Sequence, residues 1–204
     1  MIKRLAASGL IFLMLFSLTV CSKKGKVASP TFKGESSYAW RGFQKDHIPA
    51  KWSMEDGVLF FDPTADGDGG DIIIDKKYAN FHLKLEWKIS EGGNSGIFYL
   101  GSEDPEFKAI YQTAPEMQVL DNERHPDAKL GKNGNRKSGS LYDLIPADPQ
   151  NCKPAGEWNQ VEVIHKNGHV VHRMNGKKVV EYQAGTDEWK ELVAGSKFPG
   201  LNPD

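Results

Sequence analysis

Cysteine is scarce in this sequence, and Cys21 and Cys152 are its only two. Cys21 directly follows an apolar N-terminal segment and is a candidate for lipid attachment, which would leave Cys152 without an intramolecular disulfide partner. We therefore expect an apolar core to hold the fold together. A chain of this length can bury about 70% of the surface that it exposes when unfolded, and a single domain is the simplest expectation.

The sequence also lacks an excess of charge of one sign. Lys and Arg number 26, Asp and Glu number 27, and the formal net charge is −1. Several of the cations lie within the first 30 residues, so the rest of the chain is mildly acidic. A protein that binds nucleic acid usually presents a basic face, and we expect no nucleic-acid partner here.

Only one long apolar run occurs, and it lies near the N-terminus. It extends from Leu5 to Val20 and is preceded by Lys3 and Arg4. The run is shorter than the roughly 20 residues that a membrane-spanning helix needs. Residues 1–20 are therefore typical of a signal peptide and predict an exported protein.

The residues around Cys21 are typical of a bacterial lipoprotein. Leu18-Thr19-Val20-Cys21 resembles the lipobox, in which the Cys becomes the lipidated first residue of the mature chain. The polar and basic residues that follow predict a flexible tether, so we expect a lipidated Cys and tether at 21–30 and a folded domain at 31–204. The lipid would anchor the protein to a membrane, facing the periplasm or on the outer membrane. The alternative is a secreted protein with an unmodified Cys21.

A period of two dominates the rest of the chain. Residues 81–89 alternate apolar and polar side chains, as a half-buried strand does. Three segments near the C-terminus are separated by two Asn-Gly pairs, and these segments are 161–166, 169–174 and 178–182. Because Asn and Gly tolerate the positive φ of a type I′ turn, they predict a three-stranded antiparallel meander.

Further short strands and a single helix complete the predicted elements. The strands are expected at 58–61, 71–74, 96–100, 117–120 and 141–144. The helix would have Thr186 as its N-cap and Trp189, Leu192 and Val193 as its apolar stripe. Many short strands joined by turns, with almost no helix, predict an all-β fold, a jelly-roll β-sandwich with one short C-terminal helix.

The predicted strand around Glu116 carries candidate catalytic residues. Glu116 and Gln118 share one face, and Met117 and Val119 share the other. Asp121 would join the polar row only if a one-residue bulge preceded it. Glycosidases with a sandwich fold use such acidic rows, because cleaving an acetal takes two carboxyl groups. The alternative is an exposed strand face with solvated polar residues.

Other candidate residues lie in loops. His125, in the loop after that strand, could act as a base near neutral pH, although a plain surface loop explains it almost as well. Asn94 and Ser95 offer hydrogen bonds to sugar hydroxyls, or else form a structural turn. Three tyrosines could stack on a sugar ring, and these are Tyr99, Tyr111 and Tyr142.

Metal sites are weakly indicated. The Asp-rich and Gly-rich segment 66–71 has oxygen ligands that calcium favours but lacks the distal Glu of an EF-hand loop. His165, His169 and His172 lie in the predicted meander without a carboxylate pattern typical of zinc. A divalent cation is therefore left open as a cofactor.

Several motifs together resemble one family. These motifs, in order, are Glu86-Trp87-Lys88-Ile89-Ser90, Gly93-Asn94-Ser95-Gly96-Ile97, Glu116 to Asn122, Gly139 to Leu144, Gly156-Glu157-Trp158-Asn159 and the Asn175-Gly176 turn. They resemble the 3-keto-disaccharide hydrolase family, long catalogued as a domain of unknown function. The match runs from about Phe32 to the last residue.

The resemblance implies a fold and a substrate class. Family members have a concanavalin A-like jelly roll, are often lipid-anchored in bacteria, and act as glycoside-cleaving hydrolases on sugars whose C3 hydroxyl is oxidised to a ketone. The expected substrate is therefore a 3-keto-disaccharide or 3-keto-glycoside. A sugar 3-oxidoreductase acting upstream would supply the ketone.

The resemblance also implies an elimination at C1 and C2 followed by hydration, because the ketone acidifies the C2 hydrogen. Glu116 or His125 would remove that proton. Asp121 or Asp143 would assist the leaving oxygen. The residues expected to bind the substrate are Gln118, Asn94, Ser95, Tyr142, Tyr99 and Asn122. A divalent cation could polarise the ketone.

One departure from the family pattern concerns the C-terminus. Family members continue into closing strands, whereas this sequence ends at residues 198–204. We expect either a truncated sequence or a degenerate copy that lacks those strands and has impaired stability and activity. Two alternatives to an enzyme stay open at this point. One is a non-catalytic carbohydrate-binding lipoprotein on the same fold, and the other is a surface scaffold that binds no saccharide.

Lipidation of Cys21 is directly testable. Cells that express the full chain should incorporate radiolabelled palmitate into the protein, because the predicted lipobox makes Cys21 the modified residue. The Cys21→Ser variant should incorporate none, and Cys152→Ser should be labelled like the parent. Equal labelling of the parent and Cys21→Ser would contradict the prediction.

Overall fold

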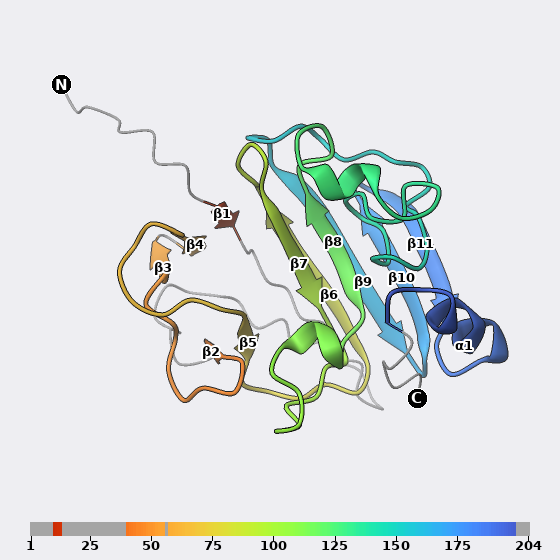
Figure 1. The fold of residues 1–204 in the computed structure, drawn as a ribbon, viewed down its shortest axis with the longest axis horizontal. Helices are drawn as coiled ribbons and strands as arrows, with labels where there is room; N and C mark the ends of the chain where they lie inside the picture. The colour runs from red at the N-terminus through yellow and green to blue at the C-terminus, as the bar shows by residue number, and fades with distance from the viewer. Residues whose placement is uncertain (1–9, 14–39, 56, 199–204) are drawn as a thin grey trace, which may run out of the picture.

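The computed structural model describes residues 10–13, 40–55 and 57–198 (Figure 1). Its strands are β1 (Leu10–Leu13), β2 (Trp40–Gly42), β3 (Trp52–Glu55), β4 (Val58–Phe61), β5 (Ile72–Ile74), β6 (Phe81–Trp87), β7 (Asn94–Phe98), β8 (Glu116–Leu120), β9 (Asn159–Lys166), β10 (His169–Met174) and β11 (Lys177–Gln183). The helices are α1 (Asp187–Ala194) and the short 3₁₀ turns η2 (Ile110–Gln112) and η3 (Pro126–Lys129).

An antiparallel sheet in the order β11-β10-β9-β6 forms one layer. The predicted meander is confirmed, because β9, β10 and β11 pair in succession. All four turn residues have positive φ, with 51° at Asn167, 82° at Gly168, 47° at Asn175 and 80° at Gly176. The alternation of β6 is confirmed too, since its apolar side chains are buried and face the core.

The hairpin of β7 and β8 packs over this sheet and encloses the main core (Figure 1). Met117 and Val119 of β8 are fully buried, and they join Val163 of β9 and Met174 of β10 in one cluster. A hydrogen bond of 2.7 Å between Tyr99 Oη and His172 Nε2 crosses between the layers. The protein is an all-β sandwich with one short helix. Its finer assignment as a concanavalin A-like jelly roll stays a prediction.

The N-terminal half adds two smaller sheets. β2 pairs with β5, and β4 pairs with both β3 and β1. The predicted strands at 58–61 and 71–74 correspond to β4 and β5, whereas the sequence did not predict β2 and β3. β1 falls within the predicted signal peptide. The rest of that peptide, Cys21 and the predicted tether lie outside the described residues.

The predicted strand at 141–144 is wrong. Leu141 makes only isolated bridges to Met117 and Ile145, and the chain then turns, with a φ of 62° at Asp143. The turn is closed locally, because the amides of Leu144 and Ile145 both donate to the carbonyl of Leu141. The apolar residues of this segment are typical of a strand, but local hydrogen bonds fold it into a tight turn instead.

The helix α1 begins where it was expected. Thr186 Oγ1 accepts a hydrogen bond of 3.2 Å from Trp189 N, so it is the N-cap. Trp189 and Val193 are buried, and Trp189 stacks on Tyr182 of β11. Leu192 differs from the expectation, because it is exposed. Across the described ranges, no helix combines the length and apolarity that crossing a membrane would require.

The turn at Gly176 provides a test of the meander. A Cβ at this position would meet no atom within 4 Å, so Gly176→Ala introduces only the backbone strain of a positive φ. We expect it to lower the free energy of unfolding by about 1–2 kcal/mol. The control Gly195→Ala, at a φ of −85°, should change it by less than about 0.5 kcal/mol. Urea unfolding measures both, and equal effects would contradict this account of the turn.

Candidate active site

A cleft of about 1650 Å³ is lined by residues of β2, β5, β7 and β8 and by the segment after α1. Seven of the individual residues that the sequence singled out for catalysis or sugar binding lie on its walls. They are Asn94, Ser95, Tyr99, Tyr111, Glu116, Gln118 and Tyr142. The cleft therefore brings together the predicted base, Glu116, and most of the predicted sugar-binding residues.

Glu116 pairs with Phe98 of β7, and its side chain lies over Gly96. A Cβ built on Gly96 would lie 2.1 Å from Glu116 Oε1, so this carboxyl fits only because position 96 is a glycine. Removal from water raises the pKa of Glu116 to about 8. The positive charge of Lys197 opposes this rise, while the negative charges of Asp71 and Asp127 add to it.

The two faces of β8 are divided as predicted. Glu116 and Gln118 line the cleft, while Met117 and Val119 lie in the core. Gln118 is itself almost fully buried, and its Oε1 accepts a hydrogen bond of 2.9 Å from Val119 N. Its side chain is thus held in one orientation at the wall of the cleft.

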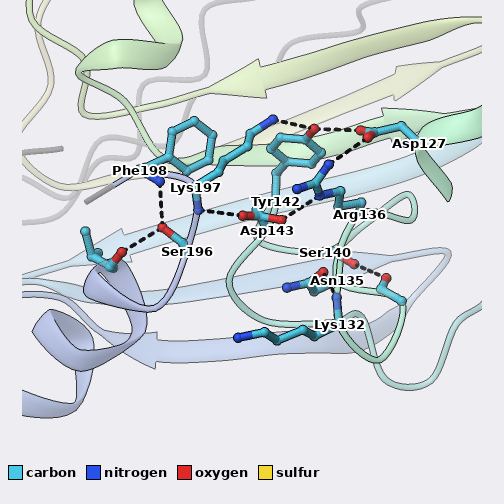
Figure 2. A network of polar contacts seen from close by, with 12 residues as sticks. Asp127, Lys132, Asn135, Arg136, Ser140, Tyr142, Asp143, Ser196, Lys197 and Phe198 are labelled. Carbon is cyan, nitrogen blue, oxygen red and sulfur yellow. Dashed lines mark hydrogen bonds and ion pairs between the residues drawn. The ribbon is translucent and has the colours of Figure 1, made fainter. Parts of the chain in front are cut away.

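Tyr142 connects the cleft to a network of charged groups (Figure 2). Its hydroxyl donates to Asp127 Oδ2 at 2.6 Å and accepts from Lys197 Nζ at 2.7 Å. Burial and the hydrogen bond to Asp127 raise the pKa of Tyr142, so the phenol stays protonated. Burial alone would also raise the pKa of Asp127, but hydrogen bonds from Tyr142 and Arg136 lower it overall.

Arg136 extends the network behind Tyr142. Its Nη1 donates to Asp127 Oδ1 at 3.0 Å, and its Nε donates to Asp143 Oδ1 at 2.5 Å. The other oxygen of Asp143 accepts from Lys197 N at 2.8 Å. Two carboxylates, one guanidinium and one ammonium thus link the loop 126–143 to the segment after α1.

Asp121 does not line the cleft. The β7–β8 ladder is regular from Asn94 opposite Leu120 to Phe98 opposite Glu116, so the bulge that would have turned Asp121 toward the cleft is absent. The buried carboxylate instead accepts hydrogen bonds from the amides of Gly92 and Glu123. Burial would raise its pKa, but these amides and Arg124 lower it. The geometry gives Asp121 the role of closing the turns at the ends of both strands.

Three other predicted residues also lie off the cleft walls. Asn122 Oδ1 accepts from Ser138 N at 2.9 Å. His125 Nδ1 accepts from Asp127 N at 3.2 Å and caps η3. Asp143 is engaged by Arg136 and by the backbone of Lys197. The contacts of all three hold loops in place.

Tyr99 lines the cleft, but most of its side chain is buried. His172 Nδ1 lies 3.2 Å from the carbonyl oxygen of Gly139, which can only accept, so Nδ1 carries the proton. Burial lowers the pKa of His172 to about 4, and its neutral Nε2 therefore accepts from Tyr99 Oη. Tyr182 Oη lies 2.9 Å from the same hydroxyl. The hydroxyl of Tyr99 is thus engaged within the core.

The structure adds two cleft residues that the sequence did not single out as catalytic. Asp71 lies on the wall of the cleft, and part of its side chain is exposed to solvent. Desolvation by the surrounding protein nevertheless raises its pKa. It had drawn attention only as part of a candidate calcium loop. Lys197 follows α1, where no motif marks it. Both affect Glu116 through their charges.

Within residues 10–13, 40–55 and 57–198, no three His, Cys, Asp or Glu side chains gather closely enough to hold a metal ion. In the candidate calcium loop, Asp68 forms an ion pair with Lys45 and accepts from Ala50 N. These contacts lower the pKa of Asp68. The described residues therefore supply no preformed set of metal ligands.

The comparisons with known proteins agree on one family. A sequence model of the family described as the 3-keto-alpha-glucoside-1,2-lyase-like domain matches residues 28–201. A curated protein of Bacteroides thetaiotaomicron, named 3-keto-disaccharide hydrolase, is 50% identical over 180 residues, which cover 82% of this chain and 62% of that protein. The chain thus spans less than two thirds of the length of this relative.

Solved structures from Parabacteroides distasonis are also similar. One provisionally assigned glycosyl hydrolase is 31% identical with a TM-score of 0.70, covering 80% of this chain and 77% of that one. A second is 27% identical with a TM-score of 0.56, covering 71% of this chain and 72% of that one. These similarities support the sandwich arrangement of the strands.

The raised pKa of Glu116 predicts a pH dependence of stability. At a pH between the ordinary glutamate pKa of about 4.3 and the raised pKa of Glu116 in the folded protein, the folded state holds a proton that the unfolded chain has lost. The free energy of unfolding should therefore decrease as pH rises from about 4.5 to 8, by at most about 1.4 kcal/mol per pH unit from this group.

Urea unfolding over this pH range measures the effect. Glu116→Gln should flatten the dependence, since it removes the titrating group, whereas Glu157→Gln on the exposed surface should leave it unchanged. An unaltered slope in Glu116→Gln would show that Glu116 titrates as an ordinary glutamate.

Proposed function

Because the chain belongs to the 3-keto-alpha-glucoside-1,2-lyase-like domain family, we propose that it cleaves glycosides whose C3 hydroxyl has been oxidised to a ketone. The relative named 3-keto-disaccharide hydrolase supports this substrate class. The observation that carries the proposal is Glu116, a carboxyl group with a pKa raised to about 8 on the wall of the cleft.

Glu116 has the properties of the base that this reaction needs. A ketone at C3 makes the hydrogen on C2 acidic, and a carboxylate of raised pKa is a stronger base than an ordinary one. Near neutral pH, part of the Glu116 population is still ionised and can accept the proton. Activity should therefore increase as pH rises toward 8. His125, the other predicted base, is off the cleft wall and caps η3.

The proposed elimination is balanced without an oxidant or reductant. Glu116 takes the C2 proton, and the electron pair of that C–H bond forms the C2=C3 bond of an enolate. The enolate then restores the ketone, forms a C1=C2 bond and breaks the bond from C1 to the aglycone oxygen. That oxygen takes up a proton, which Glu116 can return. Addition of water across C1=C2 yields the free 3-keto sugar and completes net hydrolysis.

The cleft has room and polar groups for such a substrate. Its volume of about 1650 Å³ exceeds the roughly 300–1,000 Å³ typical of small-molecule pockets, which leaves space for a sugar and its aglycone. Asn94, Ser95 and Gln118 line the same cleft as Glu116. Their amides and hydroxyl would hold the sugar hydroxyls and set the C2 hydrogen against the carboxyl group.

The proposal includes a location and an upstream partner. A lipid on Cys21 would place the enzyme at a bacterial membrane, facing the periplasm or on the outer membrane. Because ordinary glycosides carry a hydroxyl at C3, an oxidation at C3 must precede the cleavage. A sugar 3-oxidoreductase is the class of enzyme that supplies this ketone.

Aglycone release tests the proposal. The purified protein should release the aglycone from a 3-keto-glucoside but not from its unoxidised parent, and deuterated water should label C2 during turnover. Glu116→Gln should lower the rate by about 10²–10⁴-fold, because it removes the base. Glu157→Gln is the matched surface control and should be fully active. A parallel reaction with a chelator shows whether a metal contributes.

The contrary outcomes separate the alternatives. Equal cleavage of both glucosides, or cleavage without deuterium at C2, would rule out elimination. Binding of the keto sugar without any release would instead indicate a carbohydrate-binding protein. Absence of both binding and release would leave a scaffold lipoprotein as the better description.

A further inference from the structure

We propose that Lys197 is a catalytic residue of this reaction, whose ammonium group binds the C3 oxygen and stabilises the negative charge that forms there when Glu116 removes the C2 proton. The inference rests on the proposed function and adds the cation that an enolate mechanism needs. Lys197 belongs to none of the sequence motifs that mark the family resemblance.

Lys197 is held at two points. Its backbone N–H donates to Asp143 Oδ2 at 2.8 Å, and its Nζ donates to Tyr142 Oη at 2.7 Å (Figure 2). Asp143 and Tyr142 are in turn held by Arg136 and Asp127. This support fixes a long, flexible side chain that would otherwise lose much conformational entropy on binding a ligand.

The ammonium keeps donors for a ligand. An ammonium group has three N–H bonds, and Tyr142 Oη accepts one of them while its own proton goes to Asp127. Among residues 10–13, 40–55 and 57–198, this is the one hydrogen bond that Lys197 Nζ makes. Lys197 lines the cleft and is exposed there, so its other N–H bonds can meet a substrate.

Four cationic side chains among the described residues line the cleft, and Lys197 is the one of these four suited to this role. Arg41 is engaged by Asp75 and Glu103. Lys76 lies over the ring of Tyr78, and Lys197 likewise lies over the rings of Tyr142 and Phe198, so ring contact does not distinguish the two lysines. The fourth is Lys77.

Tyr142 links Lys197 to Glu116, because its hydroxyl accepts from Lys197 Nζ and its backbone N–H donates to the carbonyl of Glu116 at 2.9 Å. Of the four cations, Lys197 is also the one whose charge acts on the pKa of Glu116. A base and a cation that influence each other across one cleft can act on neighbouring atoms of the bound sugar, such as C2 and O3.

The environment of Lys197 strengthens its interaction with an oxyanion. Desolvation, together with the positive charge of Arg136, lowers its pKa, while Asp127, Asp143 and Glu116 favour the charged form. A partly desolvated charge acts more strongly than one in bulk water. The ketone oxygen is neutral before proton removal, so the ammonium stabilises the transition state more than the bound substrate.

Substitutions at Lys197 test the inference. In the full chain, Lys197→Met should lower both aglycone release and C2 deuterium exchange by about 10²–10³-fold, as expected when a donor to an oxyanion is removed. Lys197→Arg keeps the charge and should retain more activity than Lys197→Gln. Lys190→Met, on the exposed face of α1, is the matched control and should equal the parent.

A pH profile distinguishes catalysis from a structural role. Because Lys197 lowers the pKa of Glu116, Lys197→Met should move the acidic limb of the pH–rate profile to higher pH. The titration of Glu116, followed by carboxyl carbon NMR, should move in the same direction. Lys197→Arg should leave both near their parental positions.

The outcomes separate this inference from the proposed function. If the parent protein neither exchanges C2 hydrogen nor releases aglycone from the keto sugar, the proposed function itself fails. If the parent is active and a folded Lys197→Met keeps both its rate and its pH profile, Lys197 has no catalytic role. Should Lys197→Met fail to fold, the comparison of Lys197→Arg with Lys197→Gln decides, and equal rates in these two variants would overturn the inference.

Discussion

The removal of one carboxyl group from water is the constraint on which this site depends. Glu116 lies at the start of β8, and β8 is fixed because Met117 is packed into the core between the two layers. The pairing of β8 with β7 places the Glu116 carboxyl over Gly96, where a larger residue would leave no space for it. Core packing therefore offsets the free energy cost of removing this carboxyl group from water. The raised pKa of about 8 follows from the fold.

A second constraint is that charges near a desolvated carboxyl need partners of their own. The network of Asp127, Arg136 and Asp143 surrounds Tyr142 and leaves no carboxylate in it without a cation or a donor. Its components come from the loop 126–143 and from the segment after α1. Removing one member of an ion pair in this network would leave the other charge partly buried and uncompensated. The free energy cost of that charge exceeds the stabilisation that the intact pair contributes. The network thus serves mainly to hold Lys197 and Tyr142 in place.

The family relationship and the geometry address different parts of the chemistry. Membership suggests a keto sugar as substrate, while the cleft identifies which groups can act on it. Of the four predicted catalytic residues, Glu116 alone lines the cleft. Asp121 and Asp143 were chosen for their carboxylates, yet both are engaged by neighbouring groups. A residue type in the right motif does not reveal whether its side chain is free to react.

The sequence by itself determined the features that depend on neighbouring residues. The Asn-Gly turns, the alternation of β6, the cap of α1 and the shared face of Glu116 and Gln118 all follow from local backbone preferences and the period of a strand. Only the tertiary structure decided the direction of Asp121 and the meeting of Asp71 and Lys197 with Glu116. These features depend on contacts between residues far apart in the chain and on the exclusion of water, which no local pattern encodes.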